Sequence, residues 1–141
     1  MKLLVDTNIF LEVLLEQSRA NDAKKLLAKS NTHDFLISDF SLHSIGVLLL
    51  KRDKADAFRK FVSDMVIRAG TAVARLNTSD LDTLADHAAR FSLDFDDAYQ
   101  YALADKYDLT IVNFDRDFDE TTRRREDAAS PQRSPELGFG S

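Results

Sequence analysis

A chain of 141 residues has the usual size of one domain, and 44% hydrophobic with 30% charged residues is typical of a soluble globular protein. Cysteine is absent, which excludes disulfides and thiolate metal sites and leaves oxygen or imidazole ligands for any metal. The formal net charge of -5 argues against a general nucleic-acid coat, because phosphate binding normally depends on a surplus of Lys and Arg.

Residues 1–5 predict a short buried strand, because "KLLV" is apolar without alternation and polar turn residues follow it at once. This apolar run is too short for a signal peptide or a membrane span. Together with the absence of cysteine, it indicates a cytoplasmic protein with no membrane anchor. Helices are expected from Asn8 and over residues 20–29, where apolar residues recur at helical spacing.

A second strand and two helices are expected in the next part of the chain. The segment "DFLIS" at residues 34–38 has the apolar character of a buried strand. The helix after it should begin near Asp39 or Ser41, both of which are suitable for a helix start. Residues 54–70 predict an amphipathic helix that ends at Gly70.

The later part of the chain again alternates strands and helices. Residues 71–76 predict a strand, and residues 78–90 and 96–106 predict amphipathic helices. The segment "LTIVNF" at residues 109–114 predicts the last buried strand.

This alternation predicts an α/β fold, an α/β/α sandwich whose central sheet is mainly parallel and covered on both faces. We assign residues 1–122 to this domain. Residues 123–141 are polar and contain both prolines, so we expect a flexible C-terminal tail there. In parallel sheets, ligands bind beyond the carboxyl ends of the strands, at the point where the strand order switches.

Aspartates follow three of the expected strands. Asp6 follows the first strand, Asp39 the second and Asp115 the last. If these carboxylates converge at one edge of the sheet they repel each other, and a bound Mg²⁺ or Mn²⁺ would remove the repulsion, since both ions prefer oxygen ligands. The three histidines are widely separated in the sequence and form no competing ligand group. The sequence therefore predicts a metal site built mainly from aspartates.

Helix capping is the alternative explanation for these acids. Asp6 begins the run "DTN", in which all three residues are good helix caps. In "LDFDDAYQ", capping and the helix dipole account for Asp94 and Asp96, whereas Asp97 precedes an apolar helical face and should lie near the packed side, which favours a ligand role. Asp115 and Asp117 occupy alternate positions after a core strand, and either could bind metal, orient water or hold the turn.

The chain resembles the PIN-domain ribonucleases, particularly the VapC-type toxins of bacterial and archaeal toxin–antitoxin pairs. "LLVDTNIFLEVL" is similar to the family's opening strand and first acid, and "DDAYQYALADKYDLTIVNFDRDFD" to its closing acid, helix, strand and turn. The resemblance implies a PIN-like fold over nearly the whole expected domain. It also implies that Asp6, Asp97 and Asp115 are the catalytic, metal-binding acids, that Asp117 supports them, and that Asn8 matches a polar position of the family.

Two positions depart from the family pattern. Asn113 stands where Thr or Ser is usual, which could alter a hydroxyl contact near the metal or phosphate. The family's second acid is usually a Glu in the helix after the second strand, and the matching position falls at or beside Ser44. We rank Asp39 ahead of Glu12 as a partial substitute, and His43, which could contact water or phosphate, is more simply explained as a packing or surface residue.

The resemblance implies a metal-dependent endoribonuclease that hydrolyses RNA phosphodiester bonds with Mg²⁺ or Mn²⁺. It further implies an RNA substrate, an antitoxin protein that blocks the cleft, and a homodimer. No nucleophilic side chain is needed, which agrees with the lack of Cys and of a recognisable Ser-His pair. The alternative is a catalytically weakened PIN-fold module that binds RNA or a protein partner. A phosphoacceptor receiver or a phosphatase agrees less well, since "DTN" lacks the paired acids of the former and the D-x-D of the latter.

Overall fold

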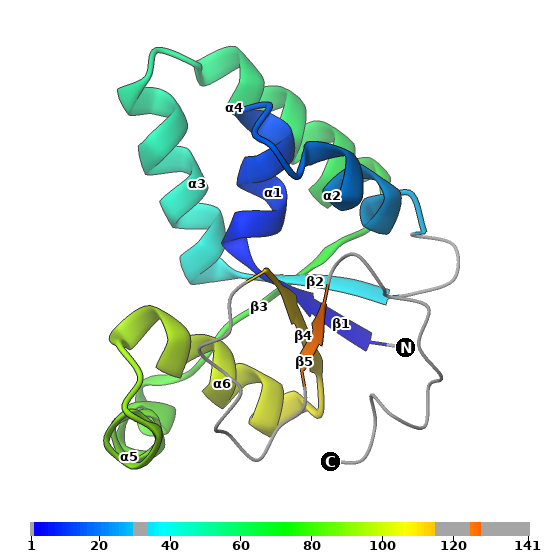
Figure 1. Cartoon of the computed structure of the whole chain (residues 1–141). Coiled ribbons are helices and arrows are strands. Elements are labelled where there is room, and N and C mark those ends of the chain that lie inside the picture. Colours follow the sequence, from blue (N-terminus) through cyan, green and yellow to red (C-terminus); the bar gives the residue numbers. More distant parts are fainter. Residues whose placement is uncertain (1, 30–33, 115–124, 128–141) are drawn as a thin grey trace.

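A computed structural model of the chain describes residues 2–29, 34–114 and 125–127. Its sheet has the strand order β3-β2-β1-β4-β5, and every pair of neighbouring strands is parallel (Figure 1). The strands are β1 (Lys2–Val5), β2 (Asp34–Ser38), β3 (Ala72–Ala74), β4 (Thr110–Asn113) and β5 (Arg125–Asp127). The helices are α1 (Thr7–Leu14), α2 (Ala20–Leu27), α3 (Asp39–Lys51), α4 (Ala55–Phe61), the π-helix η1 (Val62–Arg68), the 3₁₀-helix η2 (Thr78–Asp80), α5 (Leu81–Phe91) and α6 (Phe95–Tyr107).

Helices cover both faces of this sheet. Figure 1 shows α1 to α4 on one side of the strands and α5 with α6 on the other. Leu3 and Val5 of β1 pack in a core with α1, α2 and α3, whereas Leu4 packs in a second core with α5 and α6. Because β1 is covered on both faces, all three side chains are buried, and the absence of polar alternation in "KLLV" follows. The predicted α/β/α sandwich with a mainly parallel sheet is therefore confirmed.

Most element boundaries agree with the expected ones, but the region of residues 54–70 differs. One amphipathic helix is expected there, and the structure has α4 followed by η1, in which the amide of Ala69 donates to the carbonyl of Asp64. The segment ends at Gly70, whose φ is 72°. Local periodicity predicts a helix but does not distinguish an α-helix from a π-helix. The two differ only in whether each hydrogen bond spans four or five residues.

The start of α3 illustrates how a cap sets a helix boundary. Ser38, the last residue of β2, is the N-cap, and its side-chain oxygen accepts a hydrogen bond from the amide of Ser41 at 2.8 Å. Asp39 is consequently already helical. The sequence indicated a start at Asp39 or Ser41, and the structure places the cap one residue before the first of these.

Strand β5 lies within the segment for which a flexible tail is expected. Residues 125–127 pair in parallel with β4, while residues 128–141 are outside the described part of the chain. Within the described residues, the helices are too short or too polar to cross a membrane.

The order of the strands creates a crevice at the carboxyl end of β1. From β1, the chain proceeds to β2 and β3 on one side, and β4 and β5 lie on the other side. The direction in which strands are added therefore switches between β1 and β4. At such a point the loops that follow the two strands lead to opposite faces of the sheet, and a ligand site opens between them. Asp6, directly after β1, lies at this point.

Replacing Gly70 tests the left-handed stop after η1. Gly70→Ala should lower the free energy of unfolding by about 1 kcal/mol, because alanine disfavours a φ of 72° and no side chain lies within 4 Å to compensate. Gly70→Asn should lose less, since asparagine tolerates this conformation better. Urea unfolding of the three proteins measures the difference, and an alanine variant as stable as the parent would contradict it.

Candidate active site at the carboxyl end of the sheet

An acidic pocket of about 250 Å³ lies where the first turns of α1, α3 and α6 meet. Four aspartates line it: Asp6, Asp94, Asp96 and Asp97. Hydroxyl groups of Thr7, Ser41 and Ser44 and the amide of Gln100 line it as well. Among the described residues, neither Lys nor Arg lines this pocket.

Asp6 is buried at the end of β1 and both of its carboxylate oxygens are engaged. Oδ2 accepts a hydrogen bond from the amide of Asn8 at 3.0 Å, which makes Asp6 the N-cap of α1. Oδ1 accepts a bond from Nε2 of Gln100 at 2.6 Å. Its backbone amide also donates to the carbonyl of Val112 in β4 at 3.0 Å. The capping explanation and the functional one are thus compatible, because capping uses only one carboxylate oxygen.

Gln100 is a member of the site that sequence reasoning missed. It lies on α6 with only 5% of its surface exposed, and its Nε2 is also 3.4 Å from Oγ of Ser41. That Oγ in turn accepts a hydrogen bond of 2.7 Å from the hydroxyl of Thr7. The chain of contacts joins α1, α3 and α6. A polar residue three positions after Asp97, among the apolar residues of a buried helix, is the signal that could have revealed it.

The orientation of the Gln100 amide follows from the chemistry of its neighbour. An ionised carboxylate only accepts hydrogen bonds, so the NH₂ group must face Asp6 and the carbonyl must face away. The Oε1 atom of Gln100 is buried and has no hydrogen-bond partner among the described residues. A buried acceptor of this kind next to four carboxylates suits a water or a hydrated cation as its partner.

The acids at the start of α6 divide into a cap and pocket residues. Asp94 is the N-cap, and its Oδ1 accepts a hydrogen bond from the amide of Asp97 at 2.9 Å, as the capping explanation predicted. The side chain of Asp97 is half-buried and lines the acidic pocket with Asp6. Partial burial, and secondly the negative charge of Asp94, raises the pKa of the Asp96 carboxyl above its ordinary value. Burial is therefore the larger cause of this shift, and the neighbouring negative charge is the smaller one.

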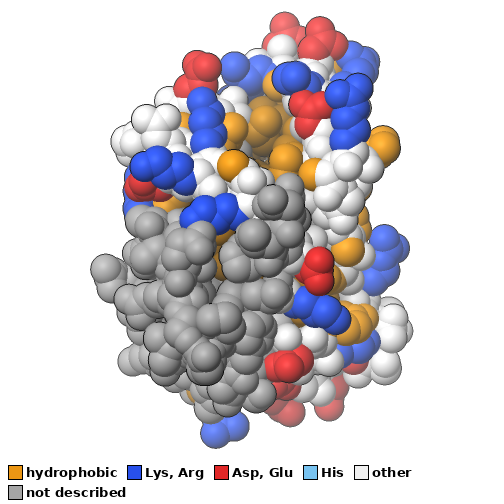
Figure 2. All heavy atoms as spheres, turned by 90° about the vertical axis from the view of Figure 1, so that its right-hand side faces the viewer, with side chains coloured by type: hydrophobic (Ala, Val, Ile, Leu, Met, Phe, Trp, Pro, Cys, Tyr) orange, Lys and Arg blue, Asp and Glu red, His pale blue; other side chains and the backbone are white. Residues whose placement is uncertain are grey.

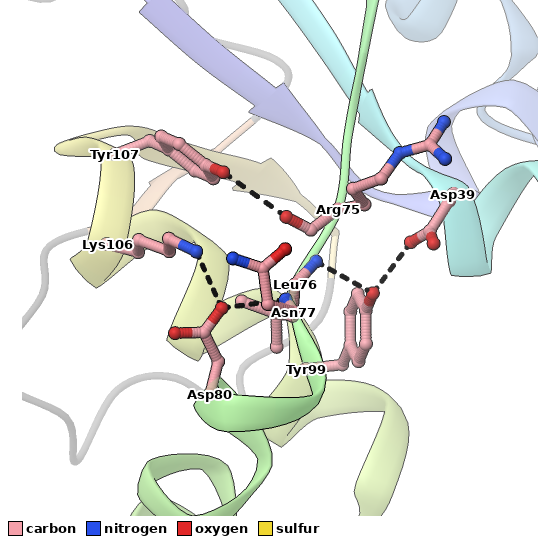
Figure 3. Close-up of polar contacts among 8 residues, drawn as sticks. All are labelled: Asp39, Arg75, Leu76, Asn77, Asp80, Tyr99, Lys106 and Tyr107. Carbon is pink, nitrogen blue, oxygen red and sulfur yellow. Dashed lines mark hydrogen bonds and ion pairs between the residues drawn. The ribbon is translucent and has the colours of Figure 1, made fainter.

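The candidates for the missing second acid lie away from the acidic pocket. The Oδ1 atom of Asp39 accepts a hydrogen bond of 2.8 Å from the hydroxyl of Tyr99, which also accepts one from the amide of Leu76 (Figure 3). Burial is the main cause that raises the pKa of the Tyr99 phenol, which keeps this donor protonated. Glu12 accepts a hydrogen bond from the amide of Arg19 at 2.6 Å. Both acids thus bind groups outside the pocket.

The remaining sequence candidates fall into three groups. Ser44, at the position of the family's second acid, and Asn8 both line the acidic pocket, whereas the exposed His43 does not. Asn113 is fully buried at the carboxyl end of β4. Asp115 and Asp117 lie outside the described residues.

The donor set of the acidic pocket fits a hard divalent cation. The described residues contain no group of three or more Asp, Glu, His or Cys side chains placed as a complete metal site. However, carboxylate, hydroxyl and amide oxygens are the ligands that Mg²⁺ and Mn²⁺ prefer, and these ions usually keep several waters. A pocket of about 250 Å³ has room for such waters, each of which occupies about 30 Å³ in the liquid. Asp6 and Asp97 are the pocket acids that could hold the ion directly.

Comparison with known proteins identifies the same fold. Residues 3–124 match the family model described as PIN domain. The VapC20 toxin of Mycobacterium tuberculosis, described as cleaving the sarcin-ricin loop, is similar with a TM-score of 0.69 and 20% identity over 83% of this chain and 92% of that one. VapBC2 from Rickettsia felis, bound to a DNA fragment from its promoter, gives a TM-score of 0.74 and 13% identity over 90% and 98%.

A toxin-antitoxin complex from Klebsiella pneumoniae is also similar, with a TM-score of 0.63 and 18% identity over 86% of this chain and 93% of that one. No curated protein matches the sequence closely enough to count as a relative. At these identities, the likeness to solved structures establishes the fold.

Removing the amide of Gln100 should destabilise the protein. Gln100→Leu leaves Oδ1 of Asp6 without its buried donor, so the free energy of unfolding should fall by about 1–3 kcal/mol. Urea unfolding provides the measurement. Gln17→Leu, at an exposed loop position, is the matched control and should change stability by less than about 0.5 kcal/mol. Equal effects of the two substitutions would contradict the role given to the contact.

Gln100→Glu should make stability depend on pH in a defined direction. The substitution places a carboxyl group where the amide now lies 2.6 Å from Oδ1 of Asp6. Two ionised carboxylates at this distance repel each other, so the folded state is favoured only when the two groups share a proton. The pKa of the pair is then higher in the folded than in the unfolded state. The variant should therefore approach the parent's stability at low pH and lose it as pH rises through the folded pKa. Thermal unfolding between pH 4 and 8, compared with the parent, measures this, and a constant difference would refute it.

Proposed function

The chain belongs to the PIN domain family, and from that premise we propose that it is a metal-dependent endoribonuclease that hydrolyses RNA phosphodiester bonds as the toxin of a toxin–antitoxin pair. The observation that carries this proposal is the acidic pocket, into which Asp6 and Asp97 come from opposite parts of the sequence. A pocket lined by four aspartates is poorly suited to bind an anionic strand by itself. It is well suited to hold a cation, and the cation can then bind the phosphate groups of the strand.

Asp6 and Asp97 would hold the Mg²⁺ or Mn²⁺ ion, together with Asp115 by the family pattern. When bound, the ion supplies activation of a water molecule and stabilisation of negative charge on the scissile phosphate. The protein's own contribution is to fix these carboxylates in place. The amide of Asn8 and Nε2 of Gln100 each hold one oxygen of Asp6, so its carboxylate cannot rotate freely.

The pocket compensates in part for the missing glutamate. Ser44 provides only a hydroxyl at that position. Asp94 and Asp96, which also line the pocket, add negative charge at its rim and can hold water molecules around an ion. This supports an active nuclease over the weakened binding module, which remains the alternative if cleavage is absent.

An apolar pocket supports the proposal of an antitoxin partner. It has a volume of about 230 Å³ and lies between α1, α2, α4 and η1, with Val13, Leu14 and Met65 among its lining residues. Figure 2 shows hydrophobic side chains at the surface in the upper part of the molecule, with Lys, Arg, Asp and Glu around them. The similar structure from Klebsiella pneumoniae is described as a toxin-antitoxin complex. We propose that an apolar antitoxin segment packs here, and that the protein acts in the cytoplasm as a homodimer.

The first experiment is cleavage of single-stranded and structured RNA with Mg²⁺, Mn²⁺ or EDTA. The parent should cut with either ion and not with EDTA. Asp6→Asn and Asp97→Asn should each cut at least about 100-fold more slowly, because loss of a charged ligand removes several kcal/mol of charge stabilisation. Asp82→Asn, at an exposed position of α5, is the matched control and should cut normally. A well-folded parent that binds RNA or a protein but cuts nothing with either ion would favour the binding module.

Ser44→Glu should strengthen the site. The new carboxyl restores the family's usual acid in a residue that lines the acidic pocket, so Mn²⁺ affinity should rise about tenfold and less metal should be needed for half-maximal cleavage. Calorimetric titration with Mn²⁺ measures affinity independently of cleavage. His43→Glu, an exposed neighbour on α3 outside the pocket, is the control and should change neither. Equal gains from both substitutions would show that only long-range charge is involved.

The antitoxin proposal is tested by expression in cells. The chain should arrest growth, and co-expression of a small DNA-binding protein encoded beside its gene should relieve the arrest. Leu14→Arg places a charge in the apolar pocket, so growth arrest should persist while relief is lost. A Leu14→Arg variant that is still neutralised would place the antitoxin elsewhere.

A further inference from the structure

Phe95 exposes a large aromatic ring beside the acidic pocket. It is the first residue of α6, and 52% of its surface is exposed. Its neighbours in sequence, Asp94 and Asp96, both line the pocket. A single exposed apolar residue is common on protein surfaces, so a function for this ring depends on what surrounds it.

Two other rings hold Phe95 from the protein side. Its centroid lies 5.7 Å from that of Phe40 and 6.1 Å from that of Tyr99, and Phe40 and Tyr99 are 5.6 Å apart. Phe40 itself lines the acidic pocket, so the cluster is continuous with the pocket wall. We call Phe40, Phe95 and Tyr99 the aromatic cluster.

Hydrogen bonds fix the inner end of this cluster. The hydroxyl of Tyr99 donates to Asp39 at 2.8 Å and accepts from the amide of Leu76 at 3.1 Å (Figure 3). These bonds tie α6 to the segments after β2 and β3. The ring of Phe95 is thus supported by a rigid base while its outer surface meets solvent. Pre-ordered rings of this kind bind planar groups without a large loss of side-chain entropy.

The electrostatics of the pocket favour a base as the occupant. Carboxylates at the rim repel phosphate groups except where a cation lies between them, so the strand needs contacts that do not depend on charge. The face of a nucleobase stacks on an aromatic ring whatever its sequence. Only an unpaired base offers such a face, because bases within a duplex are already stacked on their neighbours.

We propose that Phe95, supported by Phe40 and Tyr99, is a stacking site for one unpaired nucleobase of an RNA strand whose phosphate reaches the acidic pocket. This inference rests on the proposed nuclease function and adds the class of substrate. The site selects single-stranded segments and loops over duplex RNA. The stacked base lies within a nucleotide or two of the bond that is cut, because Asp94 and Asp96 flank Phe95.

An abasic scan tests the inference. Single-stranded RNA 10-mers, each with one abasic ribose at a successive position, are bound to the parent and to Phe95→Ala in Ca²⁺, with RNA integrity checked on a denaturing gel. Affinity is measured by fluorescence anisotropy. Loss of one base–ring stack weakens binding about 5- to 150-fold. The parent should show this loss at one position, and Phe95→Ala should bind intact RNA weakly without any further loss there.

Matched variants separate the ring from other effects. Phe95→Tyr keeps a ring and should bind like the parent. Ile67→Ala removes an exposed apolar side chain from η1, where 72% of Ile67 is exposed, and should leave the abasic profile unchanged. Thermal unfolding of every variant establishes that it is folded.

Two results would overturn the inference. One is an abasic profile of Phe95→Ala that equals the parent's. The other is a loss of affinity that is uniform over all abasic strands and accompanied by a change from dimer to monomer in light scattering, which would assign Phe95 to a contact between two copies of the chain. In either case, normal metal-dependent cleavage by the parent would leave the proposed function intact. A parent that neither binds nor cuts RNA would overturn both.

Discussion

The carboxylate of Asp6, held in place at the end of β1, is the constraint around which the rest of this structure is arranged. One of its oxygens caps α1, the other receives the amide of Gln100 from α6, and its backbone amide bonds to β4. A buried carboxylate is costly unless it is fully hydrogen-bonded. The sheet and the helices on both of its faces therefore have to converge at this point, and the same convergence forms the acidic pocket.

The convergence brings several negative charges together at one edge of the sheet. Four aspartates line the pocket, and at its rim partial burial, with the negative charge of Asp94 as the second cause, raises the pKa of the Asp96 carboxyl. A fold that accumulates such charge loses stability unless something offsets it, and at functional sites that cost is commonly tolerated. The divalent cation that we propose would satisfy both the charge and the oxygen donors. The departure from the family pattern at Ser44 lowers the number of acids without removing this property.

The polar and aromatic parts of the site have separate tasks. Asp6, Gln100, Ser41 and Thr7 form a buried hydrogen-bonded chain that fixes geometry. The aromatic cluster of Phe40, Phe95 and Tyr99 is anchored through Asp39 and leads from the pocket to the surface. Asp39 therefore holds Tyr99 in place and does not line the pocket, although its position after β2 made it a candidate ligand. In the proposed nuclease, the first group would serve catalysis and the second would bind the RNA strand.

The sequence by itself determined most of the secondary structure and the acids at its junctions, because these depend on local patterns, but it did not separate α4 from η1 or indicate β5. The apolar residues Phe35 to Ile37, between the polar Asp34 and Ser38, indicated the bounds of β2, and Asp94 caps α6 as its spacing to Asp97 indicated. Long-range partners were decided only in the tertiary structure. Gln100 meets Asp6 across 94 positions and Tyr99 meets Asp39 across 60, and these pairings depend on strand order and helix placement. No local period encodes a contact of that range, since it arises from how the two helical layers pack against the sheet.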